Sequence, residues 1–319
     1  MNPIIEYVRK NFIPQKDSNL EYIVYSGSRG EKGFIKLIFY SNGHPILVGK
    51  VARDKAGIGL KNEYSSLKIL QKILKNSNLI KTIETPFSFI NLDNNFVLFK
   101  DYKEGIRGDK YISNNKFNRQ RMKKALILLH ASTDWLIKFL TETREYHINS
   151  KEEKTKLAYE LINGGNLPLY LKYWVDRDKF FLAPSHGDLT LSNILMKDLE
   201  VSCVLDFENF TLKGFPLADL IGIIVDAGAI LYGTNQQMIN NTFFELNPFS
   251  QEVYRCILKF CEVFRIDIKD FIRVMPIYTD RAISICAKWN MNPDFHIKLK
   301  YELIKRYDEL LRTIKMIHR

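Results

Sequence analysis

Two carboxylates and one amide in the second half of the chain have the types and spacing that phosphate chemistry needs. Asp188 precedes Asn193 by five residues, and Asp206 follows an apolar run over residues 201–205. Asn193 and Asp206 offer the oxygen donors that a hard cation such as Mg²⁺ prefers, whereas Asp188 is suited to accept the proton of an attacking hydroxyl. Two carboxylates about 4 Å apart repel by about 4 kcal/mol at an effective dielectric near 20, so the set predicts a bound metal.

Each of these residues taken alone has a simpler explanation. A single Asp or His in a chain of 319 residues is more often a surface charge or a hydrogen-bonded structural group than a catalyst. We therefore expect His186 to orient the backbone near Asp188 rather than to react. The ordered set of Asp, Asn and a second Asp at the end of an apolar strand is much less common by chance, and it is the set that points to phosphoryl transfer.

The segment from His186 to Asn193 reads HGDLTLSN. It resembles the catalytic loop of the aminoglycoside phosphotransferase and choline kinase-like family, the small-molecule branch of the protein-kinase-like superfamily, in which Gly187 replaces the Arg of protein kinases. The resemblance implies a two-lobed α+β fold with a small antiparallel-sheet N-lobe and a mostly helical C-lobe. It also implies a kinase that moves the γ-phosphate of ATP or GTP to a hydroxyl of a small molecule, with Asp188 as base and Mg²⁺ held by Asn193 and Asp206.

The same resemblance implies a lysine on the third strand and a partner glutamate on the following helix. Lys50 ends the run Ile46-Leu47-Val48-Gly49-Lys50, and Glu63 begins the helical pattern after it. In the family this lysine contacts the α- and β-phosphates of the nucleotide and the glutamate pairs with it. Outside this order along the chain, both would be ordinary surface charges.

Further nucleotide-binding positions follow from the resemblance. The loop between the first two strands contains Gly27, Ser28 and Gly30, whose backbone amides could cover phosphates. The spacing departs from the Gly-x-Gly-x-x-Gly of protein kinases, so a plain hairpin loop stays an alternative. Phe99 and Tyr102 correspond to the hinge that binds the base.

Three other residues are assigned supporting roles by the resemblance or by their context. Asp219 resembles a family aspartate that steadies the catalytic loop, and we treat it as structural. His130 lies in a helix that usually ends with a leucine-histidine pair and is also expected to be structural. Glu208 stands where protein kinases have Gly and is a candidate for an additional metal ligand, ranked below Asp206.

The first hundred residues have the pattern of strands. β-Branched and aromatic runs predict strands over residues 22–25, 34–40, 46–51 and 95–99. Asn42-Gly43 between two of them predicts a tight antiparallel hairpin, since both residue types tolerate positive φ. A helix is expected over residues 61–75, because its leucines and isoleucines recur on one face.

The remainder of the chain has a helical pattern. We place the lobe boundary in a polar connector at residues 100–105, which predicts a nucleotide-binding lobe over residues 1–103 and a catalytic and acceptor-binding lobe over 104–319. Helices are expected over residues 118–144, 150–163, 216–232, 249–264 and 295–317. Only residues 185–207 interrupt this helical pattern.

Composition excludes few classes of function. The net charge of +11 makes phosphate-bearing partners plausible. Charged residues near the N-terminus disfavour a secretory signal, so we expect a cytoplasmic protein. The apolar stretch 215–232 contains Asp219 and Asp226, which predicts a buried helix rather than a membrane span. Cysteines at 203, 256, 261 and 286 lack the spacing of a zinc site, and we expect them to be reduced core residues.

Two alternatives to an active small-molecule kinase stay open. A nucleotide-binding pseudokinase or regulatory scaffold would share the fold, although the intact set of Lys50, Asp188, Asn193 and Asp206 argues against it. A nucleic-acid-binding protein would use the positive charge, but no aromatic or compact basic motif supports it, and we expect no nucleic-acid partner. The acceptor is not fixed by the family. Basic residues slightly outnumber acidic ones over 221–319, which disfavours a polycationic antibiotic.

Overall fold

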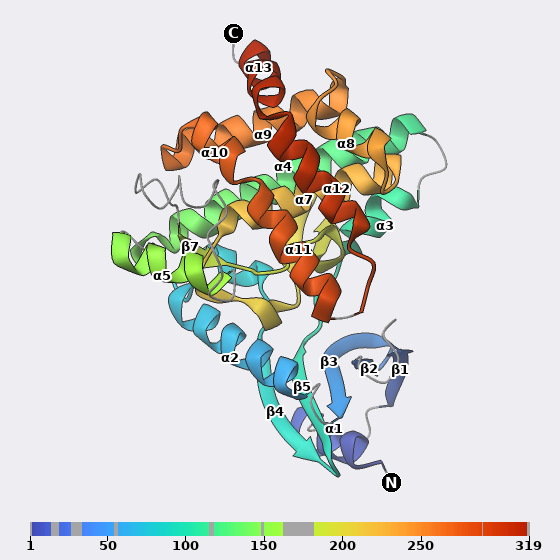
Figure 1. Ribbon diagram of the computed structural model, residues 1–319. Coiled ribbons are helices and arrows are strands. Elements are labelled where there is room, and N and C mark those ends of the chain that lie inside the picture. The colour runs from blue at the N-terminus through green and yellow to red at the C-terminus, as the bar shows by residue number, and fades with distance from the viewer. Residues whose placement is uncertain are drawn as a thin grey trace. The chain divides into compact units, whose positions relative to one another are not determined.

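The computed structural model describes residues 2–13, 19–26, 34–53, 57–114, 118–147, 150–161, 182–288 and 290–317. The chain forms two compact units (Figure 1). The sheet unit comprises Met1–Gly105 and Ser202–Phe210, and the helical unit comprises Ile106–Val201 and Thr211–Arg319. The chain thus returns to the sheet unit for one short segment, which contains Asp206. The functional division into residues 1–103 and 104–319 stays a prediction.

A five-stranded antiparallel sheet forms the centre of the sheet unit, in the order β1-β2-β3-β5-β4. Its strands are β1 (Leu20–Ser26), β2 (Ile35–Ser41), β3 (His44–Arg53), β4 (Pro86–Leu92) and β5 (Asn95–Asp101). Four of them coincide with predicted strands, whereas β4 lies outside the predicted segments. The predicted α+β class is confirmed, since a small antiparallel sheet in the N-terminal region is followed by a mostly helical remainder.

Two tight turns set the register of this sheet. Asn42 and Gly43 have φ angles of 51° and 78°, as the Asn-Gly pair predicts for the β2–β3 hairpin. Asp93 and Asn94 have φ angles of 47° and 63° between β4 and β5. Asn and Asp adopt this left-handed conformation more readily than other non-glycine residues, because their short side chains hydrogen-bond locally.

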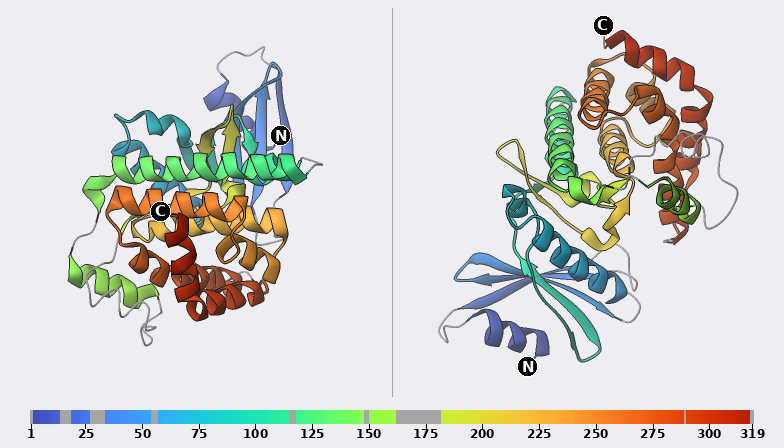
Figure 2. Two further views of the ribbon diagram at one scale, coloured as in Figure 1. Left: turned by 90° about the horizontal axis from the view of Figure 1, so that it is seen from above. Right: turned by 90° about the vertical axis from the view of Figure 1, so that its left-hand side faces the viewer.

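Two helices cover opposite faces of the sheet (Figure 2). Along β5, Phe99 packs in a cluster with Val8 of α1 (Pro3–Phe12). Its neighbour Leu98 points the other way and packs against α2 (Gly57–Ile73). Because Lys50 lies directly opposite Leu98 in the ladder, its side chain is on the α2 face. The 3₁₀ turns η3 (Asn78–Thr82) and η6 (Phe207–Asn209) complete this unit.

The helical unit is built around the buried helix α7. Its helices are α3 (Gly108–Ser113), α4 (Asn118–Glu142), α5 (Lys151–Leu161), α7 (Pro216–Tyr232), α8 (Gln236–Phe243), α9 (Pro248–Phe264), α10 (Ile268–Val274), α11 (Pro276–Lys288), α12 (Asp294–Lys305) and α13 (Tyr307–Ile317). The long helix α4 packs against α7 and α9 (Figure 2). Most residues of α7 are buried, which explains why its sequence is apolar on nearly every face.

Short strands and turns surround the chemistry-bearing segment. They are β6 (Ile106–Arg107), β7 (Ala183–Ser185), β8 (Ile194–Lys197), β10 (Thr211–Gly214), η4 (Arg144–Tyr146) and η5 (Leu191–Asn193). β7 pairs with β10, and β8 lies between β6 and β9 (Glu200–Val204). The interruption of the helical pattern predicted at residues 185–207 therefore extends to β10.

Three sequence predictions about local structure need correction. The helix predicted over residues 295–317 is two helices, because Arg306 ends α12 with φ −106° and ψ 28°. The polar connector predicted at residues 100–105 begins too early, since Lys100 and Asp101 are the last residues of β5. Helices α1, α3, α8, α10 and α11 lie outside the predicted segments.

The buried helix and the core cysteines are found as predicted. Residues 216–232 form α7, and a search of the described residues reveals no helix with the length and apolar character that a membrane crossing requires. Cys203, Cys256, Cys261 and Cys286 are unpaired and buried. Burial raises the pKa of the Cys256 thiol to about 12, so it is protonated at neutral pH.

Candidate active site

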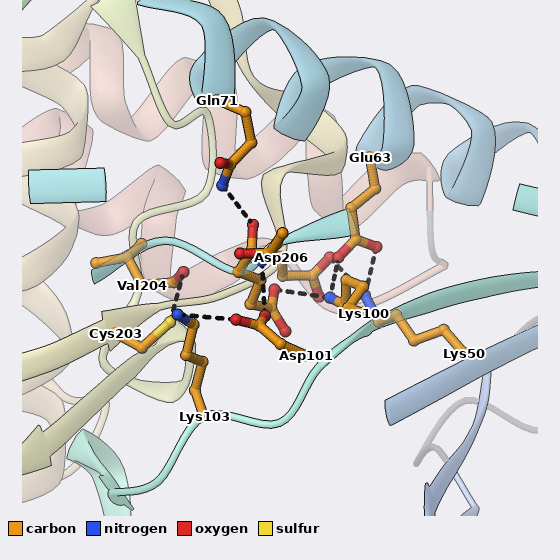
Figure 3. A network of polar contacts seen from close by, with 11 residues as sticks. Lys50, Glu63, Gln71, Lys100, Asp101, Lys103, Cys203, Val204 and Asp206 are labelled. Carbon is orange, nitrogen blue, oxygen red and sulfur yellow. Dashed lines mark hydrogen bonds and ion pairs between the residues drawn. The ribbon is translucent and has the colours of Figure 1, made fainter. Parts of the chain in front are cut away.

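Three residues far apart in the sequence meet in the sheet unit. The Lys50 ammonium lies 2.7 Å from Glu63 Oε2 and 2.9 Å from Asp206 Oδ1 (Figure 3). Strand β3 supplies Lys50, helix α2 supplies Glu63, and Asp206 follows β9. The structure thus brings together three residues that the sequence singled out for nucleotide and metal binding.

The charged groups of this arrangement are largely buried, and burial disfavours their charged forms. The side chains of Lys50 and Glu63 are 5% and 0% exposed, whereas that of Asp206 is 32% exposed. Burial by itself would lower the pKa of Lys50, but Asp206, Glu63 and the nearby Glu84 raise it above its ordinary value. Lys50 is therefore a permanent cation, held at one place by two carboxylates.

A second buried lysine contacts the same glutamate. Lys100 is 1% exposed, and its ammonium lies 2.5 Å from Glu63 Oε1 and 2.7 Å from Glu84 Oε2. Figure 3 shows Lys50 and Lys100 with both ammonium groups directed at the Glu63 carboxylate. The sequence analysis placed Lys100 in a polar connector and did not consider Glu84. Both belong to this charged network.

Asp206 has an unusual backbone conformation. Its φ and ψ are 66° and 58°, the left-handed region, immediately before η6. For a residue other than Gly this conformation costs about 1–2 kcal/mol, and such positions are often found at functional sites. Glu208 follows in η6, where a methyl group added to Gly59 of α2 would meet its Oε2 at 2.9 Å. The Glu208 carboxylate thus lies against the first turn of α2.

In the helical unit, Asp219 holds the loop that contains Asp188. Its Oδ2 accepts hydrogen bonds from the Ser185 hydroxyl at 2.7 Å and the His186 amide at 2.8 Å, and Oδ1 accepts one from the Gly187 amide at 3.2 Å. Asp219 is 1% exposed. These bonds confirm the predicted structural role, because charge-assisted bonds in a buried place fix the backbone before Asp188.

One face of α7 follows the loop for two helical turns. Asp219 lies at its start, Gly222 one turn later and Asp226 one turn after that. A methyl group on Gly222 would lie 3.2 Å from the Leu189 carbonyl oxygen, so the glycine permits close approach of the loop. Asp226 Oδ2 accepts a hydrogen bond from the Leu191 amide at 3.0 Å. A single helix therefore supports residues 185–191.

Asp226 is a site residue that the sequence analysis missed. Its pKa is raised from the ordinary value of 3.8 to about 7, chiefly by burial and also by the nearby Asp188 and Asp109, while the Leu191 amide opposes the shift. Burial raises the pKa of Tyr278 of α11, and the nearby Asp226 and Asp188 raise it as well. The sequence showed Asp226 only as a charge inside an apolar run. Its spacing of seven residues from Asp219 was the signal that could have placed both on one face.

The loop also orients His186 and Asn193. The Asp188 amide donates to His186 Nδ1 at 3.2 Å, which is the predicted orienting role of a fully buried His186. Asn193 Nδ2 donates to the Asp188 carbonyl at 2.9 Å, which directs its Oδ1 oxygen elsewhere. An amide oxygen here and a carboxylate at Asp206 are both hard donors that suit Mg²⁺. His130, in α4, bonds through Nε2 to Glu252 at 2.8 Å.

The remaining predicted residues are placed as follows. Phe99 is fully buried and its strand pairs on both sides, so its side chain packs in the sheet, and its nucleotide contact stays a prediction. Tyr102 is half-buried after β5. Gly27, Ser28 and Gly30 lie outside the described residues. Over the described ranges, no group of three or more His, Cys, Asp and Glu side chains could hold a metal, but an amide, one carboxylate and nucleotide phosphates need no such group.

Comparisons with known proteins give matches only among solved structures. No family model matches the chain, and no curated protein sequence matches it. Aminoglycoside phosphotransferase APH(3'')-Id from Streptomyces rimosus matches at 14% identity and a TM-score of 0.46, over 87% of this chain and 99% of that one. A thermostable mutant of aminoglycoside phosphotransferase APH(4)-Ia, solved with ADP and hygromycin B, matches at 10% identity and a TM-score of 0.47, over 95% and 97%.

A third match is an aminoglycoside-3'-phosphotransferase of type VIII, at 15% identity and a TM-score of 0.42, over 82% of this chain and all of that one. Likeness at this level transfers neither an acceptor nor a residue role. The chain is similar to aminoglycoside phosphotransferases of known structure at 10–15% sequence identity.

Proposed function

We propose that the protein is a small-molecule kinase that transfers the γ-phosphate of ATP or GTP to a hydroxyl group. The observation that supports this best is the Lys50 ammonium, which is buried between Glu63 and Asp206. A buried cation with a fixed position is suited to bind phosphate oxygens, since it loses little freedom on binding. The carboxylate of Asp206 lies beside it and is suited to bind a divalent cation.

In this proposal each unit supplies part of the chemistry. Lys50, positioned by Glu63, binds the nucleotide phosphates. Asn193 and Asp206 would hold Mg²⁺, which neutralises charge on the transferred phosphoryl group. Asp188 accepts the proton of the acceptor hydroxyl while the oxygen forms its bond to the γ-phosphorus. The bond between that phosphorus and the bridging oxygen breaks, and the nucleoside diphosphate leaves with the electron pair.

The surroundings of Asp188 narrow the acceptor. Asp188 lies close enough to Asp226 of the helical unit to raise the pKa of that carboxyl. A second carboxylate near Asp188 favours an acceptor that carries an amino group beside its hydroxyl, such as an amino alcohol or aminoglycoside-like sugar. This local charge counts more than the slight excess of basic residues over 221–319, because screening limits long-range effects. A cytoplasmic location remains part of the proposal.

The test compares two Asp→Asn variants ten residues apart. Asp188→Asn removes the proposed base, whereas Asp198→Asn changes an exposed turn residue between β8 and β9 and serves as the control. Each is incubated with ATP or GTP, Mg²⁺ and a panel of neutral and amine-bearing alcohols. We expect Asp188→Asn to lose about 10²- to 10⁴-fold in turnover while nucleotide affinity is retained, and Asp198→Asn to match the wild type.

Two results would remove the proposal. Equal turnover of Asp188→Asn and wild type would exclude Asp188 as the base. Saturable nucleotide binding by the wild type without turnover on any acceptor would instead support a pseudokinase.

A further inference from the structure

The buried charges of the sheet unit include one lysine that the proposed chemistry does not use. Lys100, the residue before the end of β5, lies on the same sheet face as Lys50, since Leu98 lies opposite Lys50 and Lys100 is two residues further along the strand. Its side chain is 2% exposed. The proposed chemistry gives Lys100 no contact of its own with phosphate or metal.

Lys100 limits how the Glu63 carboxylate can turn. Glu63 Oε1 pairs with Lys100 at 2.5 Å, and Oε2 pairs with Lys50 at 2.7 Å. The terminal torsion of a glutamate is broad, so a carboxylate with one partner can rotate and still keep its hydrogen bond. With both oxygens engaged, the position of one lysine depends on that of the other.

Lys100 is itself fixed by a second acid. Glu84, before β4, pairs with it at 2.7 Å and is 4% exposed. The Glu84 carbonyl accepts a hydrogen bond from Gln71 Nε2 of α2 at 3.4 Å. The next residue, Thr85, donates its amide to Asp101 Oδ1 at 2.6 Å (Figure 3). Glu84 is therefore tied to α2 directly and to β5 through its neighbour.

Stability alone is a poor explanation for the Lys100–Glu84 pair. Removing two charges from water costs several kcal/mol per ion, and apolar residues of similar volume often stabilise such a site equally well or better. The pair has a clearer effect on geometry, because it restrains the carboxylate that positions Lys50.

We infer that Lys100 is a positioning residue, which acts through Glu63 to hold the Lys50 ammonium where nucleotide phosphates bind. The inference rests on the proposed function, because it assumes that Lys50 binds the nucleotide phosphates. It concerns residues of the sheet unit alone and names no new contact with the nucleotide. Arginine at position 100 would keep the charge and is the conservative variant.

The experiment removes the pair without leaving an unbalanced charge. Lys100→Met/Glu84→Gln deletes one positive and one negative charge and leaves the Lys50 contacts with Glu63 and Asp206 possible. Lys259→Met/Asp134→Asn makes the same kind of change at an exposed pair in the helical unit, whose side chains are 52% and 54% exposed. Lys100→Arg tests for rescue.

Two readouts are used. The first is nucleotide affinity, measured by calorimetry, together with kcat and the KM of each substrate. We expect the Lys100→Met/Glu84→Gln variant to bind nucleotide about tenfold to a hundredfold more weakly, because a small misplacement of a binding group has effects of this size. The KM of the acceptor should stay unchanged, and Lys100→Arg should recover part of the affinity.

The second readout does not depend on kinase activity. The ¹H–¹⁵N signal of the Lys50 ammonium, assigned by its loss in Lys50→Met, reports whether this group is fixed. We expect it to be resolved in the wild type and in the exposed-pair control, and broadened in Lys100→Met/Glu84→Gln. If the wild type bound no nucleotide, the proposed function would be wrong, but the Lys50 signal would still test whether Lys100 positions Lys50. An unchanged Lys50 signal or unchanged nucleotide affinity in the folded double variant would overturn the positioning role.

Discussion

The sheet unit and the helical unit hold their candidate functional groups in different ways. In the sheet unit, side chains pair with side chains, and Lys50, Glu63, Lys100 and Glu84 form a continuous buried set of charges. In the helical unit, the carboxylate of Asp219 instead accepts hydrogen bonds from the backbone and from a hydroxyl. The first arrangement positions a cation, and the second positions a loop.

This difference determines what each region tolerates. A buried ion network has both signs of charge, so removal of one member leaves its partners without compensation. Removal of Asp219 leaves mainly dipoles, because its charged neighbour Arg281, 3.5 Å away, is partly exposed to water, so we expect a smaller cost. We therefore expect the largest effects in the sheet unit and smaller ones along α7.

Replacement of Glu63 should give the largest loss of stability. Glu63→Leu leaves two buried lysines that share Glu84 and Asp206 as remaining partners, and we expect a loss of about 3–5 kcal/mol in the free energy of unfolding. The control is Asp134→Leu at the exposed pair with Lys259, where a loss below about 1 kcal/mol is expected. Urea unfolding followed by circular dichroism measures both. Equal stability of the two variants would contradict the expectation that the buried ion network of the sheet unit is the more sensitive to substitution.

Asp219→Ala should have an intermediate effect. It leaves the buried amides of His186 and Gly187 without their acceptor, and we expect a loss of about 1–3 kcal/mol in the free energy of unfolding. The matched control is Asn247→Ala, which removes the side chain that accepts the Phe249 and Ser250 amides at the start of α9. Loss of a neutral cap typically costs about 1 kcal/mol. Comparison of the two urea midpoints measures how much the charge and burial of Asp219 add to the stability that a neutral, more exposed acceptor provides. Equal losses of stability would mean that charge and burial add nothing.

The sequence predicted those candidate functional residues of the two units whose surroundings are set by residues nearby in the chain. Asn42-Gly43 predicts its hairpin because both residues tolerate positive φ, and the position of Lys50 on the third strand follows from that hairpin. The pattern HGDLTLSN identifies Asp188 and Asn193, and Asp219 follows from the family resemblance. In each case the relevant information lies within a few residues or in a known motif.

Lys100 and Asp226 could not be found in this way. A lysine after an apolar run has the pattern of a strand end reaching solvent, and nothing near it reveals Glu84, which is on the other side of the β4–β5 hairpin. Asp226 was counted only as an interruption of an apolar helix, since its neighbours Asp188 and Asp109 come from other segments. Both are buried charges whose partners are brought close by the fold, and single-sequence patterns contain no record of such pairs.

The smallest predicted effect is a pH dependence that arises from Asp226. Its pKa is about 7 in the folded protein, against an ordinary value of 3.8 in the unfolded chain. A raised pKa means that the folded state binds the proton more tightly, so this contribution to stability is complete below about pH 4 and is lost as the pH rises through 7. Because the side chain remains partly exposed, we expect a change of about 1–2 kcal/mol over this range.

The measurement is the urea midpoint between pH 4 and pH 8, without nucleotide or Mg²⁺, for the wild type and Asp226→Asn. Asn keeps an acceptor for the Leu191 amide but cannot ionise, so the variant should lose less stability across this range than the wild type. Asp198→Asn, at an exposed turn, should follow the wild-type profile. Parallel profiles for the wild type and Asp226→Asn would show that burial does not raise the pKa of Asp226, and the predicted pH dependence would be wrong.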